Sequence, residues 1–247
     1  MTPRRQHFDR PPLRPHTTTL WDYPSQQHGD GAQGDKNYVG ATPSHVIWNV
    51  LKRYSREGDV VVDPFCGSGT TLDVAKELRR EGRGFDLSPT RPDIVRADAR
   101  ALPLEAGSAQ VLFMDPPYGD HIHYSDDARC IGKLSAYDPR YFQAMRAVFD
   151  EAHRVLRPDG VLAVYVCDYF ETRKGLAPVG FGLFSLFTMR FAPIDIVAVV
   201  RRNKSLERGN FHQAAERDNF FLRGFNYLML ARKPAEAPRS RRQADRR

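Results

Sequence analysis

Several features that define other classes of protein are missing from this sequence. No apolar run approaches the ~20 residues that a membrane-spanning helix requires, and residues 1–15 lack the apolar centre of a secretory signal. The three cysteines form no Cys-x-x-Cys pair, so we expect neither a disulfide framework nor a structural zinc site. These absences predict a cytoplasmic protein that does not enter a membrane.

Hydrophobic side chains are present in the proportion that a folded domain needs. They make up 41% of the 247 residues, and charged residues make up 27%. This composition excludes disorder throughout the chain, and the length suits one globular α/β domain better than two.

Positive charge is concentrated at the two ends of the chain. Of the formal net charge of +7, residues 1–20 contribute +3 and residues 232–247 contribute +5, so the part between them carries −1. Both ends are rich in proline and lack periodicity. We therefore predict basic disordered arms over residues 1–20 and 235–247, around one domain over residues 21–234. The arms either bind a polyanion by counterion release or only improve solubility.

Apolar segments alternate with amphipathic ones from residue 43 onward. Helices are predicted to begin at Ser44 and to cover residues 72–80 and 141–156, where apolar side chains recur at helical spacing. Strands are predicted at residues 59–63, 82–86, 94–98, 111–114, 161–166, 194–200 and 227–231. This order predicts a Rossmann-like, seven-stranded, mostly parallel sheet with helices on both faces.

An aspartate ends or directly follows each of the first four predicted strands. These residues are Asp63, Asp86, Asp98 and Asp115. The carboxyl ends of parallel strands meet at one edge of a sheet, where ligands bind. An isolated aspartate is more typical of a helix cap or a turn. The common position of all four relative to the strands favours a site.

Residues 63–71, Asp-Pro-Phe-Cys-Gly-Ser-Gly-Thr-Thr, join the first of these strands to a helix. No lysine follows the second glycine, so this is not a phosphate loop, and the third glycine of a dinucleotide fingerprint is absent. A nucleoside without phosphates fits better. Asp86 would accept from both ribose hydroxyls, Asp63 would face a cationic amino-acid group, and Asp98 would accept from an adenine amine. These groups describe S-adenosylmethionine, although the loop alone is also consistent with an ordinary tight turn.

The string Asp115-Pro116-Pro117-Tyr118 follows the fourth strand. Together with residues 63–71, it resembles the amino-group methyltransferases that act on exocyclic amines of DNA bases, at adenine N6 or cytosine N4. Three shorter segments resemble the family's motif X, its ribose-binding motif and its adenine-contacting segment, at Thr42-Pro43, residues 84–89 and residues 98–103. The resemblance covers residues 40–234 and implies a class I methyltransferase fold and a site-specific DNA methyltransferase.

The resemblance also implies S-adenosylmethionine as cofactor and a set of residues that bind it. These are Pro43, Asp63, Phe65, Cys66, Gly67, Gly69, Asp86, Leu87 and Asp98. A cysteine can suggest the nucleophile of C5-cytosine methylation. Because Cys66 lies inside the cofactor loop, we expect a small buried side chain instead.

The residues Asp115 to Tyr118 suit the methylation of an exocyclic amine. Such an amine is a poor nucleophile, because its lone pair is delocalised into the ring. The resemblance assigns Asp115 and the carbonyl of Pro116 to accept hydrogen bonds from it, with Pro117 stiffening the turn. Tyr118 would stack on the extruded base, since a base inside a duplex cannot reach the methyl group. No metal is expected, because the sulfonium leaves as a neutral thioether. The alternative is a plain proline turn with a surface tyrosine.

Two segments are candidates for contact with nucleic acid. Residues 201–225 interleave cations with phenylalanines, which is typical of a nucleic-acid surface but also of a solvated hairpin with core phenylalanines. The loop over residues 119–140 contains His-x-His in a spacing that is no zinc signature, and we expect it to flank the target base. The residues expected to contact nucleic acid are His121, Tyr124, Arg201, Arg202, Lys204, Arg208 and Arg223.

More than one base, and either DNA or RNA, fits the sequence as the target of methylation. An initial aspartate in the Asp-Pro-Pro-Tyr string favours N6-adenine over N4-cytosine. The alternatives are an RNA base methyltransferase, acting on guanine N2 or adenine N6, and a non-catalytic DNA-binding subunit with the same fold. Residues 201–225 are the candidate segment for recognition of the target sequence. A segment this short implies low sequence specificity, a homodimer or a separate specificity subunit. Restriction–modification, an orphan methylase and phage defence are all possible settings.

Overall fold

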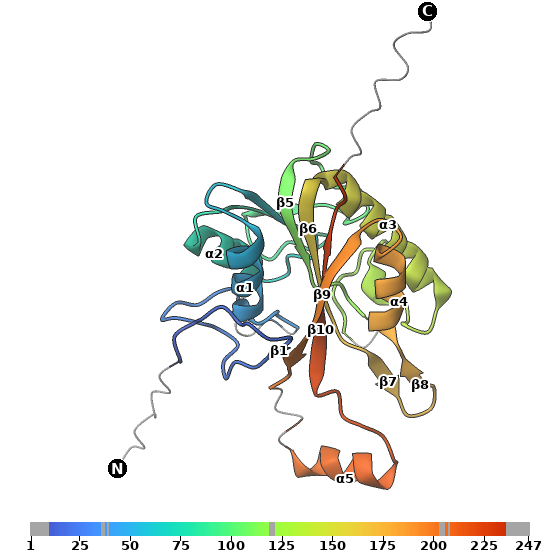
Figure 1. Cartoon of the computed structure of the whole chain (residues 1–247). Helices are drawn as coiled ribbons and strands as arrows, with labels where there is room; N and C mark the ends of the chain where they lie inside the picture. The colour runs from blue at the N-terminus through green and yellow to red at the C-terminus, as the bar shows by residue number, and fades with distance from the viewer. Residues whose placement is uncertain are drawn as a thin grey trace, which may run out of the picture.

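A twisted sheet runs through the centre of the protein (Figure 1). The computed structural model describes residues 10–35, 38, 40–118, 122–202, 206 and 208–235. In this part of the chain the sheet has eight strands in the order β1-β9-β10-β6-β5-β2-β3-β4. The strands are β1 (Leu20–Trp21), β2 (Val60–Asp63), β3 (Glu81–Asp86), β4 (Ile94–Arg96), β5 (Ala109–Met114), β6 (Leu156–Val166), β9 (Ala192–Val200) and β10 (Phe225–Arg232).

The predicted sheet is confirmed, with one addition. All seven predicted strands are present, and β10 alone runs antiparallel to its neighbours β6 and β9. The eighth strand, β1, pairs in parallel with β9 through Leu20 and Trp21 at the edge of the sheet. Two residues are too few for an alternating pattern, so this strand forms because Trp21 packs on the sheet rather than because of local propensity.

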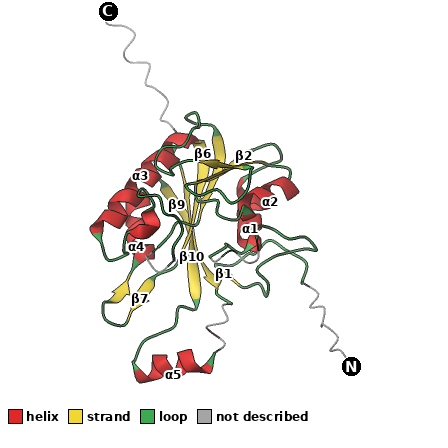
Figure 2. Cartoon of the chain, turned by 180° about the vertical axis from the view of Figure 1, so that it is seen from behind, coloured by secondary structure: helices red, strands yellow, loops and turns green. Residues whose placement is uncertain are grey.

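Helices cover both faces of the sheet, as predicted (Figures 1 and 2). One face carries α1 (Ser44–Tyr54) and α2 (Thr70–Glu77), and the other carries α3 (Pro139–Val155) and α4 (Val179–Phe187). Each face has its own core. Val46, Ile47 and Leu51 of α1 meet Val111 and Phe113 of β5 on the first face. Tyr141, Met145 and Phe149 of α3 pack with Leu112 and Met114 on the second face.

Besides β1, further elements were not predicted from the sequence, among them the 3-10 helix at Ile131–Lys133. Also among them are α4, the hairpin of β7 (Tyr169–Glu171) and β8 (Gly175–Ala177), and α5 (Gly209–Arg217). The α4 segment is apolar around most of its circumference and contains two glycines, which hides the helical period. None of the residues in α5 is buried, and the helix projects beyond the ends of β9 and β10 (Figure 1).

Residues 10–20 differ from the predicted disordered arm. The backbone N–H of His16 donates to the side-chain oxygen of Asn49 on α1 at 2.9 Å. The His16 ring stacks on the Trp21 ring, with 5.2 Å between the centroids. The Arg10 guanidinium donates to the carbonyls of Gly29 and Gly31. This stretch therefore packs on the domain. Residues 1–9 and 236–247, the rest of the two predicted arms, lie outside the described residues.

No helix in the described ranges is both long and apolar enough to cross a membrane.

Candidate active site

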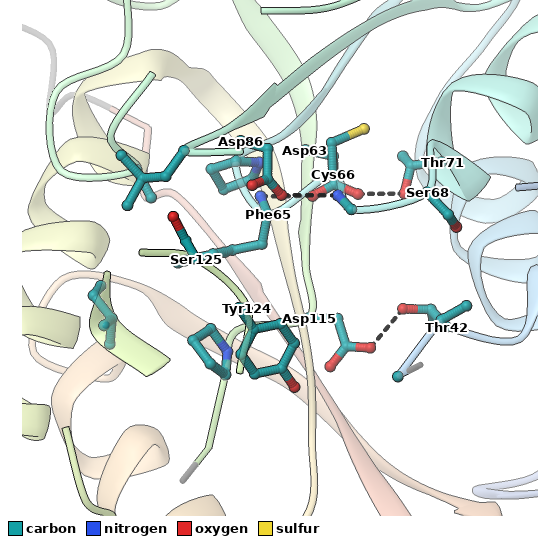
Figure 3. A pocket seen from close by; sticks show the side chains of 18 of the residues that line it. Thr42, Asp63, Phe65, Cys66, Ser68, Thr71, Asp86, Asp115, Tyr124 and Ser125 are labelled. Carbon is teal, nitrogen blue, oxygen red and sulfur yellow. Dashed lines mark hydrogen bonds between the residues drawn. The ribbon is translucent and has the colours of Figure 1, made fainter. Parts of the chain in front are cut away.

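The carboxyl ends of the parallel strands bring three of the predicted aspartates together (Figure 3). Asp63 and Asp86 are the last residues of the neighbouring strands β2 and β3, and Asp115 follows β5 on the other side of β2. All three line one cavity of about 950 Å³, together with Asp98 after β4.

Asp63 anchors the loop that forms the floor of this cavity. Its carboxylate accepts from the Thr71 hydroxyl at 2.5 Å and from the backbone N–H of Phe65 at 2.9 Å. Burial raises the pKa of Asp63 to about 7, and these two hydrogen bonds act in the opposite direction. A cation bound beside Asp63 would favour the ionised carboxylate and lower this pKa.

The glycine turn places backbone groups directly against this cavity. Gly67 and Gly69 have φ angles of +48° and +83°, in the left-handed region that favours glycine. The Gly67 N–H donates to Asp86 at 2.9 Å, which ties the turn to the end of β3. On β3, a Cβ at Gly84 would lie 2.4 Å from the Cys66 sulfur, so only glycine fits beneath the turn.

Asp98 faces the cavity but is already engaged. Its Oδ1 accepts from the backbone N–H and the Nε of Arg100, and its Oδ2 accepts from Nη2 of the same residue at 2.7 Å. The pKa of Asp98 is lowered because these hydrogen bonds outweigh its burial. The predicted contact with an adenine amine would use the remaining lone pair of Oδ2.

Asp115 is held by a residue from a distant segment. The Thr42 hydroxyl donates to its Oδ2 at 2.6 Å, which leaves Oδ1 without a hydrogen bond from the described residues (Figure 3). Burial raises the pKa of Asp115 to about 7, the nearby Asp63 adds to this effect, and the bond from Thr42 opposes it.

A second cavity of about 1190 Å³ adjoins the first. The two share Tyr38, Gly40, Ala41, Asp115 and Tyr118 as lining residues. The second cavity extends from there under the loop after β1 and across the ends of β6, β10 and β9. Asp115 and Tyr118 therefore stand at the junction of two spaces.

The loop that roofs the second cavity is fixed by a buried histidine. The two ring nitrogens of His28 lie 2.7 Å from the Ser44 hydroxyl on α1 and 2.9 Å from the Glu77 carboxylate on α2. Gln26 of the same loop donates to the carbonyl of Ala41 at 2.6 Å. These contacts fix the roof on the two helices that border the site.

The predicted cofactor residues mostly meet in the first cavity. Those that line it are Asp63, Phe65, Cys66, Gly67, Asp86, Leu87 and Asp98. Pro43 instead lines the second cavity and precedes α1. Gly69 lines neither cavity and caps α2, so its role is to form the turn. Burial raises the pKa of the Cys66 thiol, which agrees with an inert small side chain rather than a nucleophile.

Of the predicted catalytic string, Asp115 and Tyr118 line both cavities and Pro117 lines the first. Pro116 lines neither cavity. The pKa of Tyr118 is raised by burial, which keeps its phenol neutral.

Sequence reasoning missed several lining residues that come from loops. They include Tyr38, Thr42 and Ser125, and Thr71 from the first turn of α2 was missed as well. The Tyr38 ring lies so close to the glycine turn that a Cβ at Gly67 would be 3.0 Å from its Cε1. Thr42 stands beside the predicted helix start, but nothing in its local sequence indicates a contact with Asp115, 73 residues away.

The predicted nucleic-acid residues divide into three groups. Tyr124 lines the first cavity, and Arg201 and Arg202 line the second. Arg208 and Arg223 flank α5 outside both cavities. His121 and Lys204 lie outside the described residues.

Several cations of residues 201–225 have protein partners. Arg202 pairs with Asp22 at 2.6 Å, Arg201 donates to the Cys167 sulfur, and Arg223 lies over the Phe170 ring. The four phenylalanines of this segment are not core residues, and Phe221 is 83% exposed. The alternative of a hairpin with core phenylalanines is therefore wrong.

In the part of the chain that the structure covers, no group of three or more histidine, cysteine or acidic residues is arranged to hold a metal ion.

Comparison with known proteins identifies relatives of the sequence. Residues 3–96 match the family described as DNA methylase, N6_N4_Mtase. The type II methyltransferase M1.MboII of Moraxella bovis is 33% identical over 72 residues, which are 28% of each chain. M.HinfI of Haemophilus influenzae is 30% identical over 87 residues, which are 34% of this chain and 24% of that protein. Each match spans less than a third of the relative, and the family match ends before the Asp115–Tyr118 segment.

Solved structures share the fold over most of the chain. The 4+2 cyclase SpnF aligns with a TM-score of 0.53 at 19% identity, over 82% of this chain and 87% of that one. TrmN from Thermus thermophilus aligns with a TM-score of 0.52 at 19% identity, over 79% of this chain and 50% of that one. At such identities the likeness concerns the fold alone. The sequence matches show that residues 3–96 are similar to the N6/N4 DNA methylase family and that segments of the chain are similar to type II methyltransferases.

Proposed function

We propose that this protein transfers a methyl group from S-adenosylmethionine to the exocyclic amine of a DNA base, with adenine N6 favoured over cytosine N4. The observation that carries the proposal is the junction of the two cavities at Asp115 and Tyr118. One cavity has the groups that a nucleoside cofactor requires, and the other is open to a second ligand. A transfer reaction needs both ligands to meet at one point.

The first cavity fits the cofactor on three counts. Each oxygen of Asp86 accepts one backbone N–H, from Gly67 and Ser88, so both keep a lone pair that can accept from the two ribose hydroxyls. Asp63 offers a buried negative charge to the ammonium or sulfonium group. The glycine turn lets the ligand approach the backbone closely. When bound, S-adenosylmethionine supplies an activated methyl group.

At the junction, Asp115 would accept a hydrogen bond from the target amine. Thr42 occupies Oδ2, so Oδ1 is the oxygen that points to the amine. Accepting an amine hydrogen withdraws the nitrogen lone pair from the ring and makes it available for attack. Pro116 fixes the direction of its own carbonyl, which we assign as the second acceptor.

The second cavity would receive the base after it leaves the duplex. Tyr118 lies at its entrance beside Asp115 and offers an aromatic face for stacking. Arg201 and Arg202 line the same cavity where β9 ends, from which α5 projects. We assign residues 201–225 to contact with the nucleic-acid backbone, with Arg208 and Arg223 on the outer part of this segment.

The test is incubation of the protein with labelled S-adenosylmethionine and, in separate reactions, genomic DNA and total RNA, followed by nucleoside mass spectrometry. N6-methyladenine in DNA is expected, and N4-methylcytosine would confirm the class with the other base. Label in RNA alone would replace DNA as the substrate. A protein that binds cofactor and methylates neither would contradict the proposed enzyme and favour a non-catalytic subunit.

A further inference from the structure

The floor of the second cavity is a row of side chains from adjacent strands. Phe113 of β5, Tyr165 of β6 and Leu228 of β10 all pack on the face of the sheet that α1 covers. Side chains alternate along a strand, so Asp115 and Asn226, each two residues nearer the carboxyl edge, belong to this face too. Both line the cavity, as does Tyr165 between them.

Asn226 is buried there without using its acceptor. The residue is 6% exposed, and its side-chain oxygen has no hydrogen-bond partner among the residues that the structure describes. A buried acceptor without a hydrogen bond destabilises the folded protein, so such a group indicates a partner that arrives with a ligand. The backbone of Asn226 pairs regularly with Val199 of β9, which excludes strain in the strand as the reason.

A second unpaired group faces the same space from the opposite side. His45, in the first turn of α1, is 3% exposed, and neither of its ring nitrogens has a partner. Burial lowers the pKa of His45 to about 3, so the ring is neutral and offers one donor and one acceptor. The titratable groups that face it are His16, His28 and Asp22.

We infer that Asn226, with His45 opposite, holds the ring edge of the target base that lies away from the reacting amine. This inference rests on the proposed function and adds a specificity-determining residue to it. The strands β5 and β10 are two strand spacings, or about 10 Å, apart, and the register places Asn226 two residues beyond the level of Asp115, so their backbones are about 12 Å apart diagonally. This span accommodates a heteroaromatic ring with a hydrogen bond at each end, one to Asp115 and one to Asn226. A neutral amide and a neutral imidazole suit a base rather than a phosphate.

The test variant is Asn226→Leu, with Asn226→Ala as a second variant in case leucine does not fit. The control is Gln143→Leu on the exposed surface of α3, on the opposite face of the sheet. Three quantities are measured for each protein: the melting temperature, the affinity for S-adenosylmethionine by calorimetry, and kcat/KM for methylation of genomic DNA.

For Asn226→Leu we expect kcat/KM to fall about 10- to 100-fold with cofactor affinity unchanged. The melting temperature should stay the same or rise, because an unpaired polar group is removed. A structural asparagine would give the opposite result, a lower melting temperature together with any loss of activity, and would overturn the inference. Wild-type kcat/KM in both Asn226 variants would also overturn it while leaving the proposed function intact. If the wild-type protein methylates neither DNA nor RNA, the proposed function itself fails.

Discussion

The two cavities that meet at Asp115 are built in different ways. In the first, the polar groups are paired within the protein: Asp63 with Thr71, Asp86 with Gly67, and Asp98 with Arg100. In the second, Asn226 and His45 are buried without partners. The first wall is therefore rigid before any ligand binds. In the second, we infer that a ligand completes the hydrogen bonds of Asn226 and His45.

This difference in hydrogen bonding between the two cavities has a functional explanation. A cofactor that is the same in every turnover suits a preformed cradle. A substrate base must be distinguished from related bases. Buried polar groups without protein partners can do this, because a wrong base leaves them without hydrogen bonds and therefore binds less tightly. Substitutions in the first cavity should accordingly change cofactor affinity, and substitutions in the second cavity should change methyl transfer.

The largest effect is expected at the junction. Asp115→Ala removes the acceptor for the amine, so we expect methyl transfer to fall about 10²- to 10³-fold or more. Cofactor affinity should change little, because Asp86 and the glycine turn are unaffected. Transfer is measured with labelled S-adenosylmethionine and affinity by calorimetry. Transfer at the wild-type rate would mean that Asp115 is not the catalytic acceptor.

A change in the first cavity should act on the cofactor. Asp86→Ala removes the acceptor for the ribose hydroxyls and the anchor of Gly67. We expect the Kd for S-adenosylmethionine to rise about 10- to 100-fold, since hydrogen bonds to a charged group contribute about 1.5–3 kcal/mol each. At saturating cofactor, kcat should recover. A loss of kcat that saturation does not restore would contradict the division between the two cavities.

Thr42 should influence the reaction through Asp115, without touching a ligand itself. The pKa of Asp115 is about 7, and only its ionised form has both oxygens available as acceptors, so the rate should rise with pH through this range. The bond from Thr42 favours the ionised form. In Thr42→Val the acidic limb of the kcat profile should therefore move to higher pH, by about one pH unit. Thr42→Ser retains the hydroxyl and should restore the wild-type profile. A lower kcat without a shift of the limb would indicate a purely structural role.

Buried carboxylates also give the stability a defined pH dependence. The folded-state pKa values of Asp63 and Asp115, about 7, lie above the ordinary value of 3.8. The unfolded chain therefore loses these protons at lower pH than the folded protein does. The contribution of both groups to stability is fully present below about pH 4 and is lost as pH rises through 7. Asp115→Asn should reduce this loss, which urea unfolding at pH 6 and pH 8 would measure. An equal loss in the variant would show that Asp115 is already ionised at pH 6.

The smallest effect is expected from the C-terminal basic segment. Deletion of residues 236–247 should flatten the salt dependence of DNA affinity, because phosphate-bound counterions are no longer displaced by its arginines. Cofactor affinity should stay the same. The measurement is DNA binding across a salt series, and an unchanged slope would show that the segment does not contact DNA.

The sequence by itself determined the cofactor side of the protein. Strand, glycine turn, helix and strand follow one another within residues 59–86, so the contacts of Asp63 and Asp86 are local and their pattern is readable. The same holds for the seven main strands, whose apolar runs end at polar residues. The edge strand β1 and the helix α4 gave no such pattern, one because it is too short and the other because it is apolar around its circumference.

Only the tertiary structure decided how the other side is built. Thr42 reaches Asp115 across 73 residues, and Asn226, His45 and Tyr165 meet in one cavity from three separate elements. Side-chain patterns report which face of its own element a residue occupies, but not which remote residue lies opposite. That pairing follows from the strand order β5-β6-β10 and from the position of α1 over this face, which are properties of the packed core rather than of any local segment.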